Sequence, residues 1–287
     1  MPTLYEEVRA MLRDSDFRPR KSRGQNFLIH EHVVEAILRL LDLHSSDDVV
    51  EIGPGLGFLT RRLVERAQAV WAVEIDAFLA QRLREGELGA SSKFHLIYGD
   101  VLDVALPELL PKGKLKLAGN LPYNISTEVL FRIFDWREHF SSLVLMVQKE
   151  VADRIASGPG AKSYGTLSVW CQVHGRVSEK INVSPEAFYP RPKVRSTILK
   201  IELLPQARVC DDDLPVLKGL VRAAFGQRRK TLSNAVGAWL MRERDEVDGL
   251  LAANDVDPKR RGETLSVDEF IKLAQAVRQS GFLSTHN

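Results

Sequence analysis

Short apolar segments alternate with segments of helical spacing over the first half of this chain. Five candidate strands cover residues 49–52, 69–73, 94–98, 115–118 and 143–147. Helical spacing covers residues 32–41, 59–66, 78–88 and 126–134. The fifth strand candidate is continuously apolar, which is typical of a parallel strand buried on both faces. This alternation restricts the fold to a doubly wound, mostly parallel α/β sheet of the Rossmann-like kind.

Polar side chains or glycines follow four of these predicted strands. They are Glu51 with the glycines after it, Glu74, Asp100 and Asn120. Ligands of open α/β sheets bind beyond the carboxyl ends of the strands. Four such signals at one sheet edge therefore predict a binding site there.

The remainder of the chain predicts a closing hairpin and a second domain. Residues 177–183 and 196–203 alternate like an antiparallel pair that completes the sheet. Pro205 and three aspartates at 211–213 mark a linker, after which helical spacing dominates. Ser266 and Glu269 form a capping box that opens a last helix. We expect a domain over residues 1–205, with a basic N-terminal segment, and a smaller all-helical domain over 206–287.

The turn after the first predicted strand is rich in glycine. Its sequence is Glu51-Ile52-Gly53-Pro54-Gly55-Leu56-Gly57, and such a loop lets backbone amides approach a ligand closely. A dinucleotide fingerprint would need a glycine or alanine where Phe58 stands. No histidine near the sheet edge suits hydride chemistry, so a nicotinamide oxidoreductase is disfavoured. The loop resembles the first motif of S-adenosylmethionine-dependent methyltransferases.

Two carboxylates extend the predicted cofactor site. Glu74 is placed to accept hydrogen bonds from both ribose hydroxyls, and Asp100, followed by Val101, is placed to accept one from an adenine amino group. Taken alone, each can equally be an ordinary strand-end or turn residue. Their shared edge favours the functional interpretation. The candidate cofactor residues from this edge are Gly53, Gly55, Glu74, Asp100, Val101 and Asn120.

The tetrapeptide Asn120-Leu121-Pro122-Tyr123 ends the fourth strand. Pro122 lacks an amide hydrogen and keeps the preceding residue extended, which leaves carbonyls free to face a ligand. Asn120 offers an amide oxygen as acceptor, and Tyr123 offers a flat face for stacking. The four residues predict a grip on the exocyclic amino group of a planar base. The alternative is a strand-end turn with a buried tyrosine.

Basic residues gather in three runs, although the net charge is only +2. One run is usually a solvated face, but three predict a positive stripe for phosphates. The first holds Arg18, Arg20, Lys21 and Arg23, the second Arg222, Arg228, Arg229 and Lys230, and the third Lys259, Arg260 and Arg261. The predicted RNA-binding residues are Arg20, Lys21, Arg23, Arg222, Arg228, Arg229 and Lys230.

Cysteine content and hydropathy predict the compartment. Cys171 and Cys210 are far apart in sequence and lack metal-ligand spacing, so reduced thiols and no metal site are expected. No signal peptide is recognisable, and no apolar run approaches the ~20 residues of a membrane span. We expect a cytoplasmic protein, a monomer, without a membrane partner.

Further motifs occur in a fixed order along the chain. They are residues 21–28 (KSRGQNFL), 120–123 (NLPY), 148–152 (QKEVA), 188–194 (FYPRPKV) and 225–232 (FGQRRKTL). Together they resemble the ribosomal RNA adenine dimethyltransferase family, and within it the bacterial small-subunit branch. The resemblance covers about residues 21–266.

The resemblance implies a cofactor, a substrate and further site residues. It places Gln25, Asn26 and Leu28 in the S-adenosylmethionine pocket. It implies transfer of two methyl groups to N6 of each of two adjacent adenines, in a hairpin loop near the 3′ end of small-subunit rRNA, with a role in small-subunit biogenesis. The target base must leave its stack to be reached.

Catalytic candidates are Asn120, Leu121, Pro122, Tyr123 and Phe188. Tyr123 and Phe188 are the predicted stacking faces, although Phe188 can equally be a core aromatic. The glycine-rich segment 157–165 is predicted to be either a mobile lid or a plain connector.

Two alternatives to this function remain. A large-subunit rRNA adenine methyltransferase would share the catalytic motifs, but the long helical tail with Arg228-Arg229-Lys230 favours the small-subunit branch. An RNA-binding assembly or transcription factor would not need catalysis, and it would have less reason to keep Glu74, Asp100 and Asn120 together.

Overall fold

The structure, a computed structural model, describes residues 3–15, 17–20 and 24–282 of the chain. Lys21 and Arg23 of the first basic run lie outside the described residues. The chain forms two compact units, one of Met1–Ala152 with Arg176–Leu204 and one of Asp153–Gly175 with Pro205–Asn287. The chain passes between the two units three times, and the predicted boundary at residue 205 lies at the third of these points. Residues 153–175, which the predicted first domain included, cluster with the helical unit instead.

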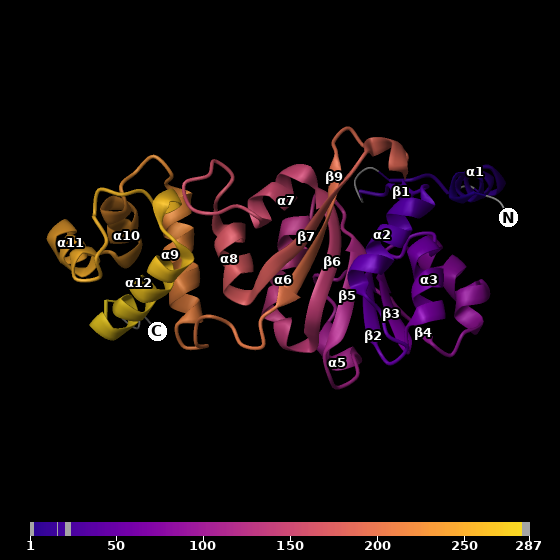
Figure 1. The fold of residues 1–287 in the computed structure, drawn as a ribbon, viewed down its shortest axis with the longest axis horizontal. Helices are drawn as coiled ribbons and strands as arrows, with labels where there is room; N and C mark the ends of the chain where they lie inside the picture. The colour runs from indigo at the N-terminus through magenta and orange to yellow at the C-terminus, as the bar shows by residue number, and fades with distance from the viewer. Residues whose placement is uncertain (1–2, 16, 21–23, 283–287) are drawn as a thin grey trace. The chain divides into compact units, whose positions relative to one another are not determined.

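The first unit is built on a seven-stranded sheet with strand order β4-β3-β2-β5-β6-β9-β7 (Figure 1). Strands β2 to β6 pair in parallel, and β9 pairs antiparallel with β6. The strands are β2 (Asp48–Ile52), β3 (Ala69–Glu74), β4 (Phe94–Tyr98), β5 (Leu115–Asn120), β6 (Phe140–Gln148), β7 (Gly175–Val183) and β9 (Ser196–Leu203). The predicted mostly parallel Rossmann-like sheet is confirmed.

Side-chain pairs give the direction of β7 against β9. Arg176 bonds to Glu202 at 2.8 Å, and Asn182 bonds to Thr197 at 3.1 Å. Residue numbers rise along one strand as they fall along the other, so the two strands are antiparallel. The predicted closing hairpin is therefore present.

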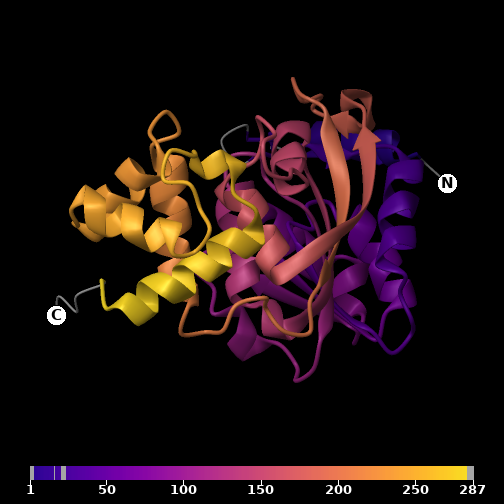
Figure 2. The same ribbon diagram turned by 60° about the vertical axis from the view of Figure 1, so that its left-hand side comes forward.

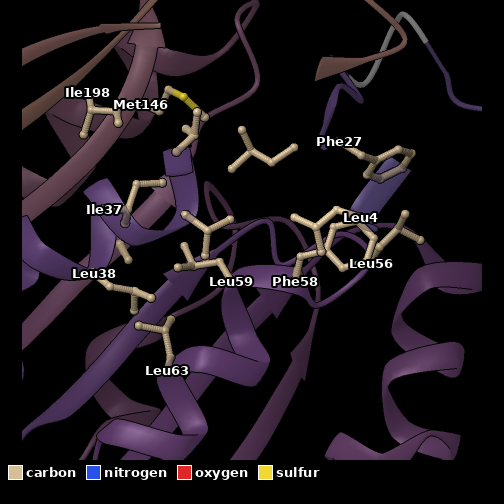
Figure 3. Close-up of a cluster of buried hydrophobic side chains, with 14 of the residues drawn as sticks. Leu4, Phe27, Ile37, Leu38, Leu56, Phe58, Leu59, Leu63, Met146 and Ile198 are labelled. Atoms are coloured by element: carbon tan, nitrogen blue, oxygen red, sulfur yellow. The ribbon is translucent and has the colours of Figure 1, made fainter. Parts of the chain in front are cut away.

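Helices between the strands cover the sheet with apolar faces. They are α2 (Glu31–Leu41), α3 (Phe58–Arg66), α4 (Ala77–Glu85), α5 (Leu106–Leu109), α6 (Ser126–Asp135) and α7 (Lys149–Ile155), with 3₁₀ turns at Glu87–Ala90 and Arg137–His139. Helix α4 ends at Glu85, earlier than predicted, because Gly86 follows it. Figure 3 shows Ile37, Leu59 and Leu63 in the core that these helices share with the sheet. Each fully buried side chain of this kind contributes roughly 1.5–3 kcal/mol.

The N-terminal segment adds elements that the sequence analysis did not predict. Helix α1 (Leu4–Asp14) opens with a capping box between Thr3 and Glu6 and buries Leu4, Val8 and Met11. The two-residue strand β1 (Phe27–Leu28) pairs antiparallel with β8 (Phe188–Tyr189), which follows a 3₁₀ turn at Pro185–Ala187. Residues 24–28 are thereby fixed beside the sheet.

The second unit is helical. It contains α8 (Thr166–His174), α9 (Leu214–Gly226), α10 (Leu232–Leu240), α11 (Arg244–Ala252), a 3₁₀ turn at Gly262–Thr264 and α12 (Val267–Ser280). Helix α12, yellow in Figure 2, packs against α9, and α8 also packs against both. These contacts explain why residues 153–175 belong to this unit. Within the described residues, no helix has both the length and the apolar character needed to cross a membrane.

Candidate active site

A cavity opens at the carboxyl edge of the parallel strands. The chain winds outward from β2 through β3 to β4 and then returns to β5 on the other side of β2. This reversal is a topological switch point, where such sheets bind ligands. The cavity holds about 980 Å³, counting the part open to solvent. Its lining includes all nine predicted cofactor residues: Gln25, Asn26, Leu28, Gly53, Gly55, Glu74, Asp100, Val101 and Asn120.

The glycine loop forms one wall of the cavity between β2 and α3. Gly53, Gly55 and Gly57 have φ values of 70°, 59° and 81°, a region that other residues rarely adopt. A Cβ on Gly55 would lie 3.3 Å from the Phe27 ring. The loop thus needs glycine both for its backbone conformation and for the close approach of the N-terminal segment.

Glu74 is held rigidly at the end of β3. Its Oε2 accepts a hydrogen bond from the Gly55 amide at 3.1 Å, and its Oε1 accepts one from the Asp76 amide at 2.8 Å. Burial raises the pKa of Glu74, while these two amides oppose the rise. Carboxylate oxygens have further lone pairs, so Glu74 can still accept hydrogen bonds from a ligand.

Asp100 lies beyond β4 on the same edge. Its Oδ1 accepts a hydrogen bond from the Leu102 amide at 2.9 Å. Oδ2 has no partner among the residues that the structure describes, and Asp100 lines the cavity. It can therefore accept a hydrogen bond from a ligand amino group.

The orientation of the Asn120 amide is set by the N-terminal segment. Asn120 Nδ2 donates to the backbone carbonyl of Asn26 at 3.1 Å, and the Asn26 side chain donates to the carbonyl of Gly24 at 3.0 Å. Only the nitrogen of an amide can donate, so Oδ1 of Asn120 is the atom left for a ligand. This fixes a neutral acceptor at the end of β5.

The rest of the tetrapeptide is anchored on three sides. The Leu121 amide donates to the Met146 carbonyl at 3.0 Å, and the Pro122 carbonyl accepts from the Ile125 amide at 3.2 Å. The Tyr123 hydroxyl hydrogen-bonds to Ser196 Oγ at 2.5 Å. The Leu121 carbonyl accepts no hydrogen bond from the described residues, so it remains a second acceptor. Leu121 itself is buried, whereas Pro122 and Tyr123 are half-buried.

Phe188 lies elsewhere than predicted. Its ring is 2% exposed and packs in the hydrophobic core, while β8 pairs with the cavity-lining residues Phe27 and Leu28. In this conformation the ring offers no face to a base, and the alternative of a core aromatic describes it. The prediction failed because apolar burial and base stacking use the same residue type.

Glu51 was one of the strand-edge signals in the sequence but was not among the predicted cofactor residues. Its carboxyl is 2% exposed, lines the cavity, and has no partner for Oε2 in the described part of the chain. Burial raises its pKa to about 8, the Glu74 carboxylate adds to the rise, and the Thr60 hydroxyl opposes it. The sequence signal for Glu51 was its place at the end of a strand, just before the glycine loop.

The predicted RNA-binding residues divide into two groups. Arg20, Arg222, Arg229 and Lys230 are exposed, and none forms an ion pair within residues 3–15, 17–20 and 24–282. Arg228 differs, because its guanidinium donates to the backbone carbonyls of Tyr164 at 2.7 Å and Lys162 at 3.3 Å. Arg228 is exposed as well, so its predicted phosphate contact stays a prediction beside this structural bond.

Fold and cavity together define a Rossmann-like methyltransferase. A family profile described as "Ribosomal RNA adenine dimethylase" matches residues 16–274. The chain therefore belongs to the ribosomal RNA adenine dimethylase family, as its motifs predicted.

Relatives agree with this assignment. "Ribosomal RNA small subunit methyltransferase A" of Geobacter metallireducens is 43% identical, over 94% of this chain and 99% of its own length. The protein of the same name from Syntrophotalea carbinolica is 45% identical, over 91% and 97%. The predicted resemblance to the bacterial small-subunit branch is confirmed.

Solved structures share the fold. A dimethyladenosine transferase from Plasmodium falciparum is 25% identical, with a TM-score of 0.78 over 89% of this chain and 98% of that one. The 23S rRNA methyltransferase ErmE is 23% identical, with a TM-score of 0.66 over 88% and 100%, a likeness of fold alone.

Proposed function

We propose that this protein uses S-adenosylmethionine to dimethylate N6 of two adjacent adenines, in a hairpin loop near the 3′ end of small-subunit rRNA. The observation that carries the proposal is the fixed orientation of Asn120, which lines the cavity and whose Oδ1 is left to accept a hydrogen bond. An exocyclic amino group has two hydrogens, and we propose the Leu121 carbonyl as the second acceptor beside Asn120 Oδ1. The proposal includes a cytoplasmic monomer with immature small subunits as partner.

The donors and acceptors of the cavity fit this cofactor. Glu74 would accept hydrogen bonds from the ribose hydroxyls, and Asp100 Oδ2 would accept one from the adenine amino group. The glycine loop, whose residues have no side chains, would let the methionine end of the cofactor approach the backbone closely. When bound, the cofactor supplies an electrophilic methyl group on its sulfonium.

The chain's own residues position the nucleophile. The adenine amino nitrogen is weak, because its lone pair is shared with the ring. Acceptance of its two hydrogens by Asn120 Oδ1 and the Leu121 carbonyl would hold that nitrogen in place and enrich its lone pair. Most of the rate gain would come from positioning. The neutral amide of Asn120 agrees with a reaction that needs no strong base, since the alkylated nitrogen can release its proton to water.

Tyr123 is proposed to stack on the flipped base. Its ring is half-buried, and the hydrogen bond from its hydroxyl to Ser196 anchors the far end of the side chain. A stacked base gains roughly 1–3 kcal/mol. Phe188 could stack on the base only if its ring left the hydrophobic core.

The experiment is incubation of the protein with labelled S-adenosylmethionine and, separately, immature small and large subunits, followed by mapping of the modified base. Two dimethylated neighbouring adenines in the small subunit support the proposal. Modification of large-subunit RNA would instead identify an enzyme of the other branch. Binding of small subunits without any methyl transfer would identify a non-catalytic assembly factor.

A further inference from the structure

Residues 24–28, named here the strap, lie against two walls of the cofactor cavity. The first residue of the strap meets the tetrapeptide at the end of β5, because an added Cβ on Gly24 would lie 3.1 Å from Pro122 Cα. Further along, the Phe27 ring lies so close to Gly55 that an added Cβ there would be 3.3 Å away. The strap therefore connects the glycine loop with the end of β5.

Gln25 joins the strap to a third wall, the end of β3. Its Nε2 donates a hydrogen bond to Asp76 Oδ2 at 3.1 Å, across 51 positions of sequence. Its Oε1 accepts a hydrogen bond from the Arg20 amide at 2.7 Å. Each polar atom of the Gln25 side chain thus has a partner within the protein itself.

Asp76 is a fixed anchor for this bond. It is 4% exposed, and its Oδ1 accepts hydrogen bonds from the amides of Phe78 at 3.0 Å and Leu79 at 3.3 Å, which caps α4. Its own amide donates to Glu74 Oε1 at 2.8 Å. The two carboxylate oxygens of Asp76 therefore have different roles: Oδ1 caps a helix, and Oδ2 holds Gln25.

The residue after Gln25 orients the amide of Asn120. Asn120 Nδ2 donates to the Asn26 carbonyl at 3.1 Å, so the position of that carbonyl decides which way the amide faces. Because Gln25 and Asn26 are neighbours in the chain, release of Gln25 from Asp76 would shift this carbonyl. A continuous series of contacts thus connects Asp76 with Asn120.

We propose that the hydrogen bond between Gln25 and Asp76 positions the amide of Asn120 for methyl transfer. The bond holds the strap in place, and the Asn26 carbonyl then keeps that amide in its orientation. The inference rests on the proposed function for the role of Asn120. It makes Asp76 a positioning residue, although Asp76 belongs to none of the sequence motifs and does not line the cavity.

An exchange of amide and carboxylate between the two positions tests the bond. In Gln25→Glu, two carboxylates face each other. In Asp76→Asn, two amide donors face each other, while the side-chain oxygen still caps α4. In the double variant, the carboxylate at position 25 can accept hydrogen bonds from the Arg20 amide and from the new side-chain amide at position 76. Both bonds are then restored, and the net charge is unchanged.

The first readout is single-turnover methyl transfer to immature small subunits at saturating S-adenosylmethionine. Each single variant should be slower than the wild type by about ten- to a hundredfold, as for a misplaced reacting group. The double variant should recover most of this loss, which is a coupling that two independent defects do not show.

The second readout needs neither cofactor nor RNA. In the cofactor-free protein, hydrogen exchange of the backbone amides of residues 24–29 should be faster in each single variant and near the wild-type rate in the double variant. The matched control is Gln81→Glu, which places a carboxylate beside Glu85 on the exposed side of α4. It should leave both readouts unchanged.

Three results would overturn the proposal. They are wild-type transfer by both single variants, a double variant slower than either single one, and an effect of Gln25→Glu on cofactor affinity without any effect on the rate at saturation. The last result would make Gln25 a cofactor contact only. If the wild type transfers no methyl group to small subunits, the proposed function fails instead, and hydrogen exchange still decides whether the bond to Asp76 holds the strap.

Discussion

Replacement of Glu51 by glutamine should change how stability depends on pH. Burial raises the pKa of Glu51 from 4.5 to about 8, so the folded protein holds a proton that the unfolded chain releases. Stability contributed by this group is complete below pH 4.5 and is lost as pH rises toward 8. The full loss is about 5 kcal/mol at most, and the slope between these values is about 1.4 kcal/mol per pH unit.

The assay is urea unfolding of the cofactor-free protein between pH 5 and pH 8. Glutamine has nearly the same shape as glutamate and does not titrate. The free energy of unfolding of Glu51→Gln, measured relative to that of the wild type, should therefore increase as pH rises. The readout is the difference between the two proteins in the slope of the free energy of unfolding against pH. A pH-independent effect of the substitution on stability does not change this slope. Parallel curves for the two proteins would refute the assignment of a buried neutral carboxyl at this position.

Four further substitutions probe the cavity and the tetrapeptide beside it. Gly55→Ala should cost about 1–2 kcal/mol of stability, because a φ of 59° disfavours a side chain and the added Cβ would press on the Phe27 ring. Urea unfolding measures this loss. An unchanged unfolding midpoint would contradict the prediction. Glu74→Ala should weaken cofactor binding about a hundredfold, because two charged hydrogen bonds worth ~1.5 kcal/mol each are lost. Calorimetric titration with S-adenosylmethionine measures the affinity. A wild-type affinity would show that Glu74 does not bind the cofactor. Ser196→Ala and Tyr123→Phe should each slow methyl transfer, because each removes the same 2.5 Å hydrogen bond. The double variant should therefore be no slower than either single variant. Additive effects on the rate would show that the two side chains act separately.

Much of the sheet and its edge could be predicted from the sequence. Buried parallel strands have a continuous apolar pattern, and the four signals from Glu51 to Asn120 share an edge because parallel strands end on the same side. The cofactor residues follow from that geometry together with the family motifs. The cavity they line is the one expected.

Other features depend on contacts that leave no local pattern. The carbonyl of Asn26 orients Asn120 across 94 positions of sequence, and any residue type has such a carbonyl. Arg228 and Arg229 are neighbours in one basic run, yet only Arg228 meets the carbonyls of the loop. Phe188 has the composition of a stacking residue and the burial of a core residue. Such roles are decided by tertiary packing, which periodicity does not encode.

The central claim is that Asn120 grips the amino group of the target adenine. The most direct measurement is single-turnover methyl transfer by Asn120→Ala on immature small subunits, alongside the affinities for cofactor and RNA. We expect transfer to fall by at least about a hundredfold, as for a misplaced reacting group, while both affinities stay near those of the wild type. Asn182→Ala, which removes an exposed asparagine of the same unit outside the cavity, should transfer normally. Transfer at the wild-type rate by Asn120→Ala would contradict the claim.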